Sequence, residues 1–336
     1  QPLLPGVSLR SGRYRLQERL EQQNWRSGVF EASWIARDFR YNRAPALVYE
    51  VVVPDTHTLE TQAILRTSTH ALLAAGRHPC IPTLHDVFND QDRTFFVFEP
   101  FAGESLQMRL NRLRSPLSES EAITFCMRMS ELLGLLASQS PPLIHGRICP
   151  EHIDLSYDAS RCSLRSFSPI VASGIKQLII EAVDEHSRPF TAPELSQGVI
   201  DTRSDLYSLL ATAYYTVTGT VPTASGGVIP QARQLNATIS ADFNAILAKG
   251  LHPASHRRYQ QAAELSHDLL AIRSRSVSGN LAWYTNANEP VSAPPAKENM
   301  ATSFESGASA SAYPFPIMFN PSTEGEGEEM ALLPSP

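Results

Sequence analysis

Residues 143–156 read LIHGRICPEHIDLS and have the outline of a catalytic loop. His145 follows two apolar residues, a Pro-Glu pair comes soon after, and apolar residues then return. A loop that activates a hydroxyl needs a side chain that accepts a proton. Arg147 in this segment only donates, whereas its two histidines and the carboxylates of Glu151 and Asp154 can accept. Whether its side chains match that chemistry depends on which positions are the reactive ones, and the rest of the chain is needed to decide.

The composition is typical of a globular protein, since 42% of the 336 residues are hydrophobic. The net charge is −6, but seven Glu and one Lys follow Arg275, so the preceding part of the chain is neutral. A neutral body argues against nucleic acid as a partner, because binding to a phosphate backbone depends on positive charge.

The four cysteines include no Cys-x-x-Cys pair, so neither a zinc ribbon nor a disulfide framework is indicated. The spacing of Cys149, His152 and Cys162 matches no metal motif, and we expect no metal. No apolar run approaches the roughly 18 residues that span a bilayer, and no signal peptide opens the chain. We expect a cytoplasmic protein without a membrane span, either free or peripheral to a membrane complex.

Hydrophobic periodicity predicts an α+β protein with two lobes. Residues 13–53 and the run ending in TFFVFEP show the short apolar runs of antiparallel strands, and one helix is expected around Leu59 to Ala75. The spacing then becomes helical, beginning with a capping box of Ser118 and Glu121. Further helices are expected over residues 203–218, 241–249 and 260–272.

From about Ser276 the chain is rich in Pro, Ser, Ala, Asn and Glu, which predicts a tail without a core of its own. One apolar island, YPFPIMF, interrupts it and is a candidate contact for a protein partner. A chance apolar stretch within a linker is an equal alternative. The candidate residues are Tyr313, Phe315, Ile317, Met318 and Phe319.

Six motifs follow one another over roughly residues 12–275, namely HPCIPTLHDVF, FVFEPFAGESL, SFS, TAPEL, SDLYSLL and HRRYQQAAEL. In this order they resemble the bacterial eukaryotic-like (Hanks-type) Ser/Thr protein kinases. HPCIPTLHDVF resembles the strand entry after the small lobe's helix, FVFEPFAGESL the gatekeeper and hinge, and SFS the metal-binding Asp-Phe-Gly. TAPEL resembles the end of the activation segment, SDLYSLL the start of a central helix, and HRRYQQAAEL a late buried Arg. The resemblance implies an extension over 1–11, a β lobe over about 12–99, a helical lobe over about 104–275 and the tail 276–336.

The resemblance also implies that the catalytic loop has lost its reactive side chains. Arg147 takes the place of the catalytic Asp, Cys149 that of the Lys, and His152 that of the metal-binding Asn. Ser166 replaces the metal-binding Asp, and a neutral hydroxyl is a poor ligand for Mg²⁺. Arg147 is expected either to be a solvated surface residue or to pair with Glu151, Asp154 or an acidic partner.

The nucleotide pocket departs from the family in the same way. The phosphate-gripping Lys falls on Val48, or on Tyr49 if the register shifts by one, and its Glu partner falls on Thr69. Asp154 replaces the Leu beneath the adenine, and an unpaired carboxylate there is expected to close the pocket, because its burial is costly. The gatekeeper and the hinge amide fall on Phe98 and Phe101, respectively.

The residues that hold such a fold together look intact. The apolar stack that joins the lobes is expected to consist of Leu73, Leu84, His145 and Phe167. Asp205 matches the carboxylate that binds the backbone near His145. Glu194 and Arg258 match the buried ion pair behind the activation segment.

The reactive residues are replaced while the residues of the scaffold are retained. We therefore expect a degenerate member of the kinase family, a pseudokinase. On this reading it is not an enzyme, has no cofactor, and works as a protein-interaction module, scaffold or structural subunit. Two alternatives stay open. One is an atypical ATP-dependent transferase that uses residues such as Glu151, Asp154 or Asp158, and the other is a metal-independent nucleotide sensor.

Overall fold

The computed structural model describes residues 3–25, 28–52, 58–169, 171–173, 175–223 and 229–285. One compact unit spans Gln1–Ala287, and Asn288–Pro336 forms a second unit that lies outside the described residues. The candidate partner contacts in the tail therefore also lie outside them. These are Tyr313, Phe315, Ile317, Met318 and Phe319.

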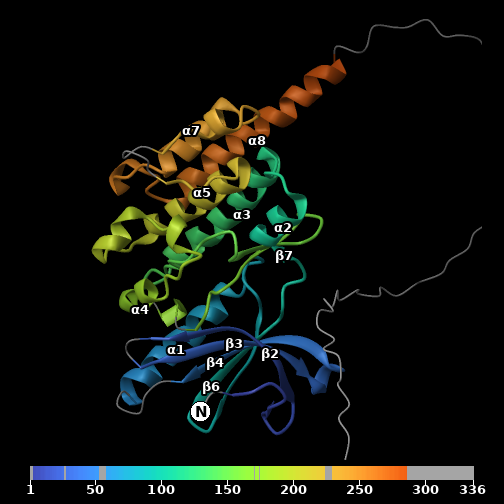
Figure 1. The fold of residues 1–336 in the computed structure, drawn as a ribbon, viewed down its shortest axis with the longest axis vertical. Coiled ribbons are helices and arrows are strands. Elements are labelled where there is room, and N and C mark those ends of the chain that lie inside the picture. The colour runs from blue at the N-terminus through green and yellow to red at the C-terminus, as the bar shows by residue number, and fades with distance from the viewer. Residues whose placement is uncertain are drawn as a thin grey trace, which may run out of the picture. The chain divides into compact units, whose positions relative to one another are not determined.

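A six-stranded antiparallel sheet with the order β1-β2-β3-β4-β6-β5 forms the first lobe, drawn in blue to teal in Figure 1. Helix α1 (Thr58–Ala75) connects β4 to β5. The strands are β1 (Ser8–Leu9), β2 (Tyr14–Asn24), β3 (Phe30–Asp38), β4 (Ala44–Val52), β5 (Leu84–Asp90) and β6 (Arg93–Phe98), and a 3₁₀ helix, η1 (Phe39–Tyr41), joins β3 to β4.

The two faces of β4 lie in different cores, because successive side chains of a strand point to opposite faces. Val48 is fully buried in the core that contains Trp34 and Phe95. Tyr49 belongs to the other core and lines both cavities between the lobes. Of the two registers that the sequence left open for the lysine position, Val48 points away from the cleft and Tyr49 faces it.

Helix α1 is likewise rotated by one residue from the prediction. Leu72 is fully buried in the core that joins the lobes, whereas Leu73 is 55% exposed. One residue turns a helix by about 100°, enough to move a side chain from core to solvent. Leu73 was thus wrongly assigned to the apolar stack, and Leu72 takes that place. By the same shift the position of the missing Glu moves from the half-buried Thr69 to the fully buried Ser68.

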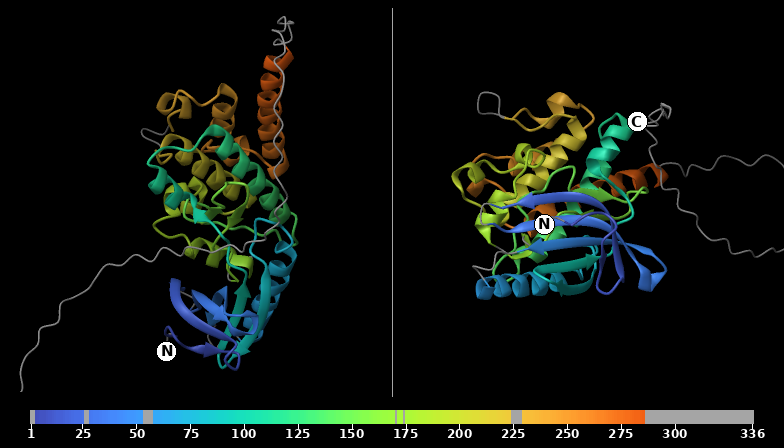
Figure 2. Two further views of the ribbon diagram at one scale, coloured as in Figure 1. Left: turned by 90° about the vertical axis from the view of Figure 1, so that its right-hand side faces the viewer. Right: turned by 60° about the horizontal axis from the view of Figure 1, so that its bottom comes forward.

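Helices build most of the second lobe, and Figure 2 shows them set apart from the blue sheet in a view turned by 90°. A small antiparallel sheet, β7-β8-β9, joins them. Its strands are β7 (Glu104–Ser105), β8 (Ile153–Leu155) and β9 (Cys162–Leu164). The helices are α2 (Leu106–Leu113), α3 (Glu119–Ala137), α4 (Lys176–Glu181), α5 (Thr202–Thr218), α6 (Ala232–Leu235), α7 (Ala241–Gly250) and α8 (Ala262–Thr285). Short 3₁₀ helices are η3 (Val171–Ser173), η4 (Arg188–Phe190), η5 (Pro193–Gln197) and η6 (Ser255–Arg257).

The main helices begin and end at the signals in the sequence. Ser118 and Glu121 form the predicted capping box of α3, which satisfies backbone N–H groups at its first turn. Gly219 follows α5 in the left-handed conformation, with φ of 71°, as the C-terminal signal predicted. Helix α8 differs, because it continues to Thr285 where a helix ending near Ile272 was expected.

The register of α1 can be tested by a pair of neighbouring substitutions. Leu72→Ala should lower the free energy of unfolding by about 2–5 kcal/mol, because it leaves a cavity in the core. Leu73→Ala should change it by less than about 0.5 kcal/mol, because that side chain is mostly in water. Urea denaturation measures both values. If Leu73→Ala lowers the free energy of unfolding more than Leu72→Ala does, the register predicted from the sequence is the right one.

Candidate functional site

Asp205, on α5, fixes the backbone of the loop that precedes the cleft. Its two carboxylate oxygens accept hydrogen bonds from His145 N at 2.7 Å and Gly146 N at 2.8 Å. Burial raises the pKa of Asp205 to about 7, although both backbone bonds oppose the rise. Gly146 has φ of 72°, and a Cβ there would lie 2.3 Å from Ile179 Cγ2, so a larger side chain does not fit. The role predicted for Asp205 agrees with this geometry.

His145 is a structural residue in this loop. Its ring stacks on Phe167 with centroids 6.2 Å apart and an interplanar angle of 21°. Because Arg147 N donates to Nδ1 at 3.2 Å, the proton lies on Nε2, which donates to the Arg165 carbonyl at 3.0 Å. Burial lowers the pKa of His145 to about 3, which keeps the ring neutral. The predicted stack of His145 and Phe167 is present, and Leu84 packs partly buried against the same core.

Arg147 is buried and bound to the segment that follows α4. Its Nη2 donates to Asp184 Oδ2 at 2.5 Å. Glu151 and Asp154, which the sequence analysis offered as partners of Arg147, are therefore not its partners. The other oxygen of Asp184 accepts from Ser187 N at 2.8 Å and Ser187 Oγ at 2.9 Å. Arg147 thereby ties residues 184–187 to the catalytic loop.

The carboxylate of this pair stays ionised at neutral pH. Burial alone would raise the pKa of Asp184, but the Arg147 guanidinium and the hydrogen bonds from Ser187 outweigh it and lower the pKa to about 2. Arg147 is 8% exposed, and its Nε has no hydrogen-bond partner among the described residues. At the position of the family's proton acceptor the cleft thus carries a cation that only donates.

The other reactive positions of the loop are neutral. His152 donates from Nδ1 to the Arg147 carbonyl at 2.6 Å, and burial lowers its pKa. Burial also raises the pKa of Cys149, which keeps its thiol protonated. Neither side chain is suited to activating a hydroxyl at neutral pH.

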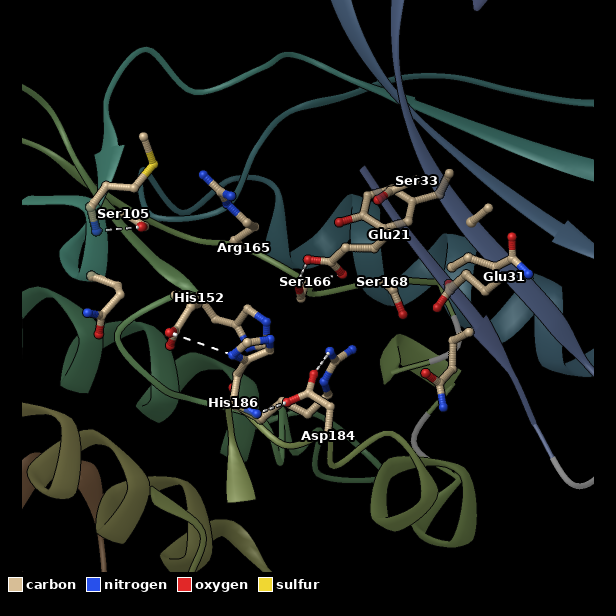
Figure 3. Close-up of a pocket in the computed structure, with 18 residues that line it drawn as sticks. Glu21, Glu31, Ser33, Ser105, His152, Arg165, Ser166, Ser168, Asp184 and His186 are labelled. Atoms are coloured by element: carbon tan, nitrogen blue, oxygen red, sulfur yellow. Dashed lines mark hydrogen bonds and ion pairs between the residues drawn. The ribbon is translucent and has the colours of Figure 1, made fainter. Parts of the chain in front are cut away.

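Ser166 lies against a carboxylate from the opposite lobe. Its Oγ is 3.4 Å and 3.5 Å from the two carboxylate oxygens of Glu21 on β2, which Figure 3 shows pointing toward it. Ser166 is almost fully buried and has φ of 58°, in the left-handed region. Sequence reasoning missed Glu21, and it also missed Glu31 and Ser33, whose alternation on β3 was the signal that they share the cleft face.

Asp154 is paired and does not close the pocket, so that expectation was wrong. Arg165 donates to it from Nη2 at 2.7 Å and from Nε at 3.1 Å. Burial raises the pKa of Asp154, and Arg165 opposes the rise. A cavity of about 320 Å³ remains beside the pair, where the adenine position was expected. Its lining includes the gatekeeper Phe98 and the hinge residue Phe101.

A second cavity, of about 510 Å³, lies toward the catalytic loop (Figure 3). Four carboxylates and two guanidinium groups line it, and they are those of Glu21, Glu31, Glu151, Asp184, Arg147 and Arg165. The side chains of His152 and His186 also reach it. Among the residues that the structure describes, no group of three or more His, Cys, Asp or Glu side chains is arranged to hold a metal ion.

The predicted ion pair behind the activation segment is formed. Arg258 donates to both oxygens of Glu194 at 2.8 Å each, and its guanidinium lies over the ring of Tyr207. Arg258 also donates to the His252 carbonyl at 2.6 Å. The pair therefore anchors the segment that leads out of the cleft to α5.

The chain is similar in sequence to bacterial serine/threonine-protein kinases. It is 26% identical to pkn2 of Myxococcus xanthus over 66% of this chain and 26% of that protein, and 25% identical to PknB of Mycobacterium tuberculosis over 71% and 40%, respectively. The chain thus spans less than half the length of these relatives. A scan against protein-family models found no match.

Solved structures show that the fold is that of a protein kinase. The PknI kinase domain of Mycobacterium tuberculosis superposes with a TM-score of 0.56 at 19% identity, covering 80% of this chain and 99% of that one. The autoinhibited serine kinase domain of titin gives 0.57 at 19% identity, covering 76% and 79%. The two-lobed α+β prediction is confirmed.

The comparisons contradict one expectation from the sequence, namely that the chain is not an enzyme. The curated relatives are named as serine/threonine-protein kinases, and the replaced residues of the loop do not outweigh that finding.

Within the described part of the chain, no helix is long and apolar enough to cross a membrane.

The pair of Arg147 and Asp184 predicts a specific dependence of stability on pH. Because the pKa of Asp184 falls from 3.8 to about 2 on folding, its contribution is present above pH 3.8 and is lost as the pH falls toward 2. That shift corresponds to about 2 kcal/mol. The free-energy difference between the wild type and Asp184→Asn, from urea denaturation, should therefore shrink between about pH 6 and about pH 3.

Glu185 offers the matched control for this measurement, because its side chain is 89% exposed. Glu185→Gln should show no such trend. A difference for Asp184→Asn that stays constant over the same range would mean that the carboxylate is not held by Arg147.

Proposed function

We propose that this chain is a protein-interaction module built on the kinase fold, and that its inter-lobe cleft takes up a positively charged segment of a protein partner. The main support for this proposal is the charge of the cavity of about 510 Å³, whose lining includes more carboxylates than guanidinium groups. A scaffold or a structural subunit of a larger assembly is the corresponding role in the cell.

The excess of negative charge follows from pairing the charges one by one. Arg147 is matched by Asp184, and Arg165 is matched by Asp154. Among the described residues, the hydrogen bonds recorded for Glu21 are the long contacts with the Ser166 hydroxyl, and Arg165 also interacts with it electrostatically. Glu151 has a buried Oε2 without a hydrogen-bond partner among those residues, while its Oε1 lies 3.9 Å from His186 Nδ1. In a cavity with walls of low dielectric, such carboxylates attract a Lys or Arg side chain more strongly than they would in open water.

A second candidate is a nucleotide-dependent function, either atypical transfer or metal-independent sensing. The cavity of about 320 Å³ supports it, since apolar and aromatic walls suit a purine ring. The relatives named as kinases support it too. Glu21 opposes it, because its carboxylate repels the phosphates of a nucleotide that brings no metal.

Helix α8 and the compact unit extend past the boundary expected at 276, so we propose that the separate tail begins after them and that Tyr313 to Phe319 contributes to partner binding. The support is the apolar island in an otherwise polar, acidic stretch. An isolated apolar segment of this kind gains affinity only when a partner buries it.

The cleft proposal can be tested with a fluorescent hexalysine peptide and a hexaglutamate peptide as its counterpart. Hexalysine should bind with an affinity that falls with added salt, and Glu21→Gln and Glu151→Gln should each weaken it about tenfold, which is about 1.4 kcal/mol. Glu185→Gln, at an exposed position, should leave the affinity unchanged. Equal binding of both peptides, or no response to either cleft variant, would refute a cationic guest.

Thermal-shift titration with ATP, with and without Mg²⁺, separates the two candidates. A ligand of the native state raises the melting temperature in a saturable way. Our proposal expects no such rise at micromolar ATP. Stabilisation without metal would favour a sensor, whereas Mg²⁺-dependent stabilisation with phosphate transfer would favour an atypical kinase.

A further inference from the structure

Two buried thiols meet where the strand-rich lobe joins the helical lobe. Cys80 lies between α1 and β5, and Cys162 is the first residue of β9. Their Sγ atoms are 3.5 Å apart, and the residues are 2% and 1% exposed. Of the four cysteines, all within the described residues, only these two are recorded in thiol contact.

We propose that Cys80 and Cys162 form a reversible intramolecular disulfide that fastens the α1–β5 connection to β9. This inference is independent of what the cleft binds. No disulfide framework was expected from the sequence, because residues 82 positions apart give no spacing signal.

The backbone around the two residues already fits a bridge. Leu164 N donates to the Cys80 carbonyl at 2.7 Å, so the two segments lie side by side and the thiol contact does not depend on long, mobile side chains. A disulfide needs an S–S distance of about 2.05 Å, so closing it requires the two sulfur atoms to approach by about 1.5 Å. Small rotations about the two Cα–Cβ bonds can supply much of that distance.

The two thiols are also chemically distinct. The contact with Cys162 lowers the pKa of Cys80, and His78 adds to this effect while burial opposes it. The same contact, together with burial, raises the pKa of Cys162. The two sulfur atoms face each other, so either can attack while the other resolves, and the lowered pKa favours Cys80 as the attacking thiolate.

Hydrogen peroxide is the oxidant class that is small enough for a buried pair. The Cys80 thiolate attacks one peroxide oxygen, the O–O bond breaks, and the departing hydroxide takes up a proton, which leaves a sulfenic acid and one water. The Cys162 sulfur then loses its proton and attacks the Cys80 sulfur, the S–O bond breaks, and a second water leaves. Two thiols and one peroxide thus give one disulfide and two waters.

A bridge here would constrain the cleft. Cys162 precedes Arg165 and Ser166 by a few residues, and both of these line the two cavities. Cys80 follows the helix that carries the buried Leu72. Cross-linking the two sites limits the relative movement of the lobes and removes conformational entropy from the unfolded chain.

The test uses the full chain, treated with hydrogen peroxide, alkylated and digested with trypsin under non-reducing conditions. Each cysteine lies in a different tryptic peptide, and the expected product joins peptide 78–93 to peptide 162–165 with the loss of two hydrogens. Dithiothreitol should reverse it. Oxidation should also raise the melting temperature of the wild type by several degrees.

Substitutions at the four cysteines provide the matched comparison. Cys80→Ser and Cys162→Ser should abolish the cross-linked peptide and the thermal shift, whereas Cys126→Ser and Cys149→Ser should keep both. If a variant does not fold, the peptide map of the wild type still decides. The peroxide concentration is one that is sufficient to oxidise glutathione. The proposal is overturned if, after this treatment, both positions remain free thiols, if a bridge forms to Cys126, or if Cys80 becomes a sulfinic acid.

Discussion

The cleft of this protein depends on one buried ion pair, that of Arg147 with Asp184. A guanidinium that is 8% exposed is tolerated only when a carboxylate neutralises it, since burying an unpaired charge costs several kcal/mol. Asp184 supplies that charge from the segment after α4 and is itself held by the N–H and hydroxyl of Ser187. The pair thus decides both the charge of the cleft and the path of residues 184–187.

Other constraints converge on the same loop. Asp205 holds the backbone at His145 and Gly146, and the His145 ring is fixed as a neutral tautomer beneath Phe167. With the cation of Arg147 cancelled, Glu21 and Glu151 give the larger cavity its negative character. The chain therefore has a kinase fold and relatives named as kinases, but its cleft carries charges that differ from those at the family's reactive positions. These charges determine which ligands the cleft can bind.

The sequence was sufficient for features that depend on order and spacing. The fold, the caps of α3 and α5, the pair of Glu194 and Arg258, and the contact of Asp205 with the loop all follow from motifs read along the chain. The sequence could not fix the register of α1 or β4 to within one residue. Leu72 and Leu73 are both Leu, and residues 46–49 are apolar without a break, so the pattern does not show which face is buried.

Contacts between distant segments were also beyond the sequence. Asp184 reaches Arg147 across 37 positions within the helical lobe, and Glu21 reaches Ser166 across 145 positions from the opposite lobe, so only the tertiary structure brings each pair together. The same holds for Arg165, which neutralises Asp154. Burial of a charge predicts that a partner exists, but tertiary structure chooses which one.

A double-mutant cycle on Arg147→Ala and Asp184→Asn tests the central claim most directly. The coupling energy from urea denaturation of the wild type, both single variants and the double variant should exceed about 1 kcal/mol, the upper end for exposed pairs. A coupling within about 0.3 kcal/mol of zero would show that the two residues do not depend on each other, and it would contradict this account of the cleft.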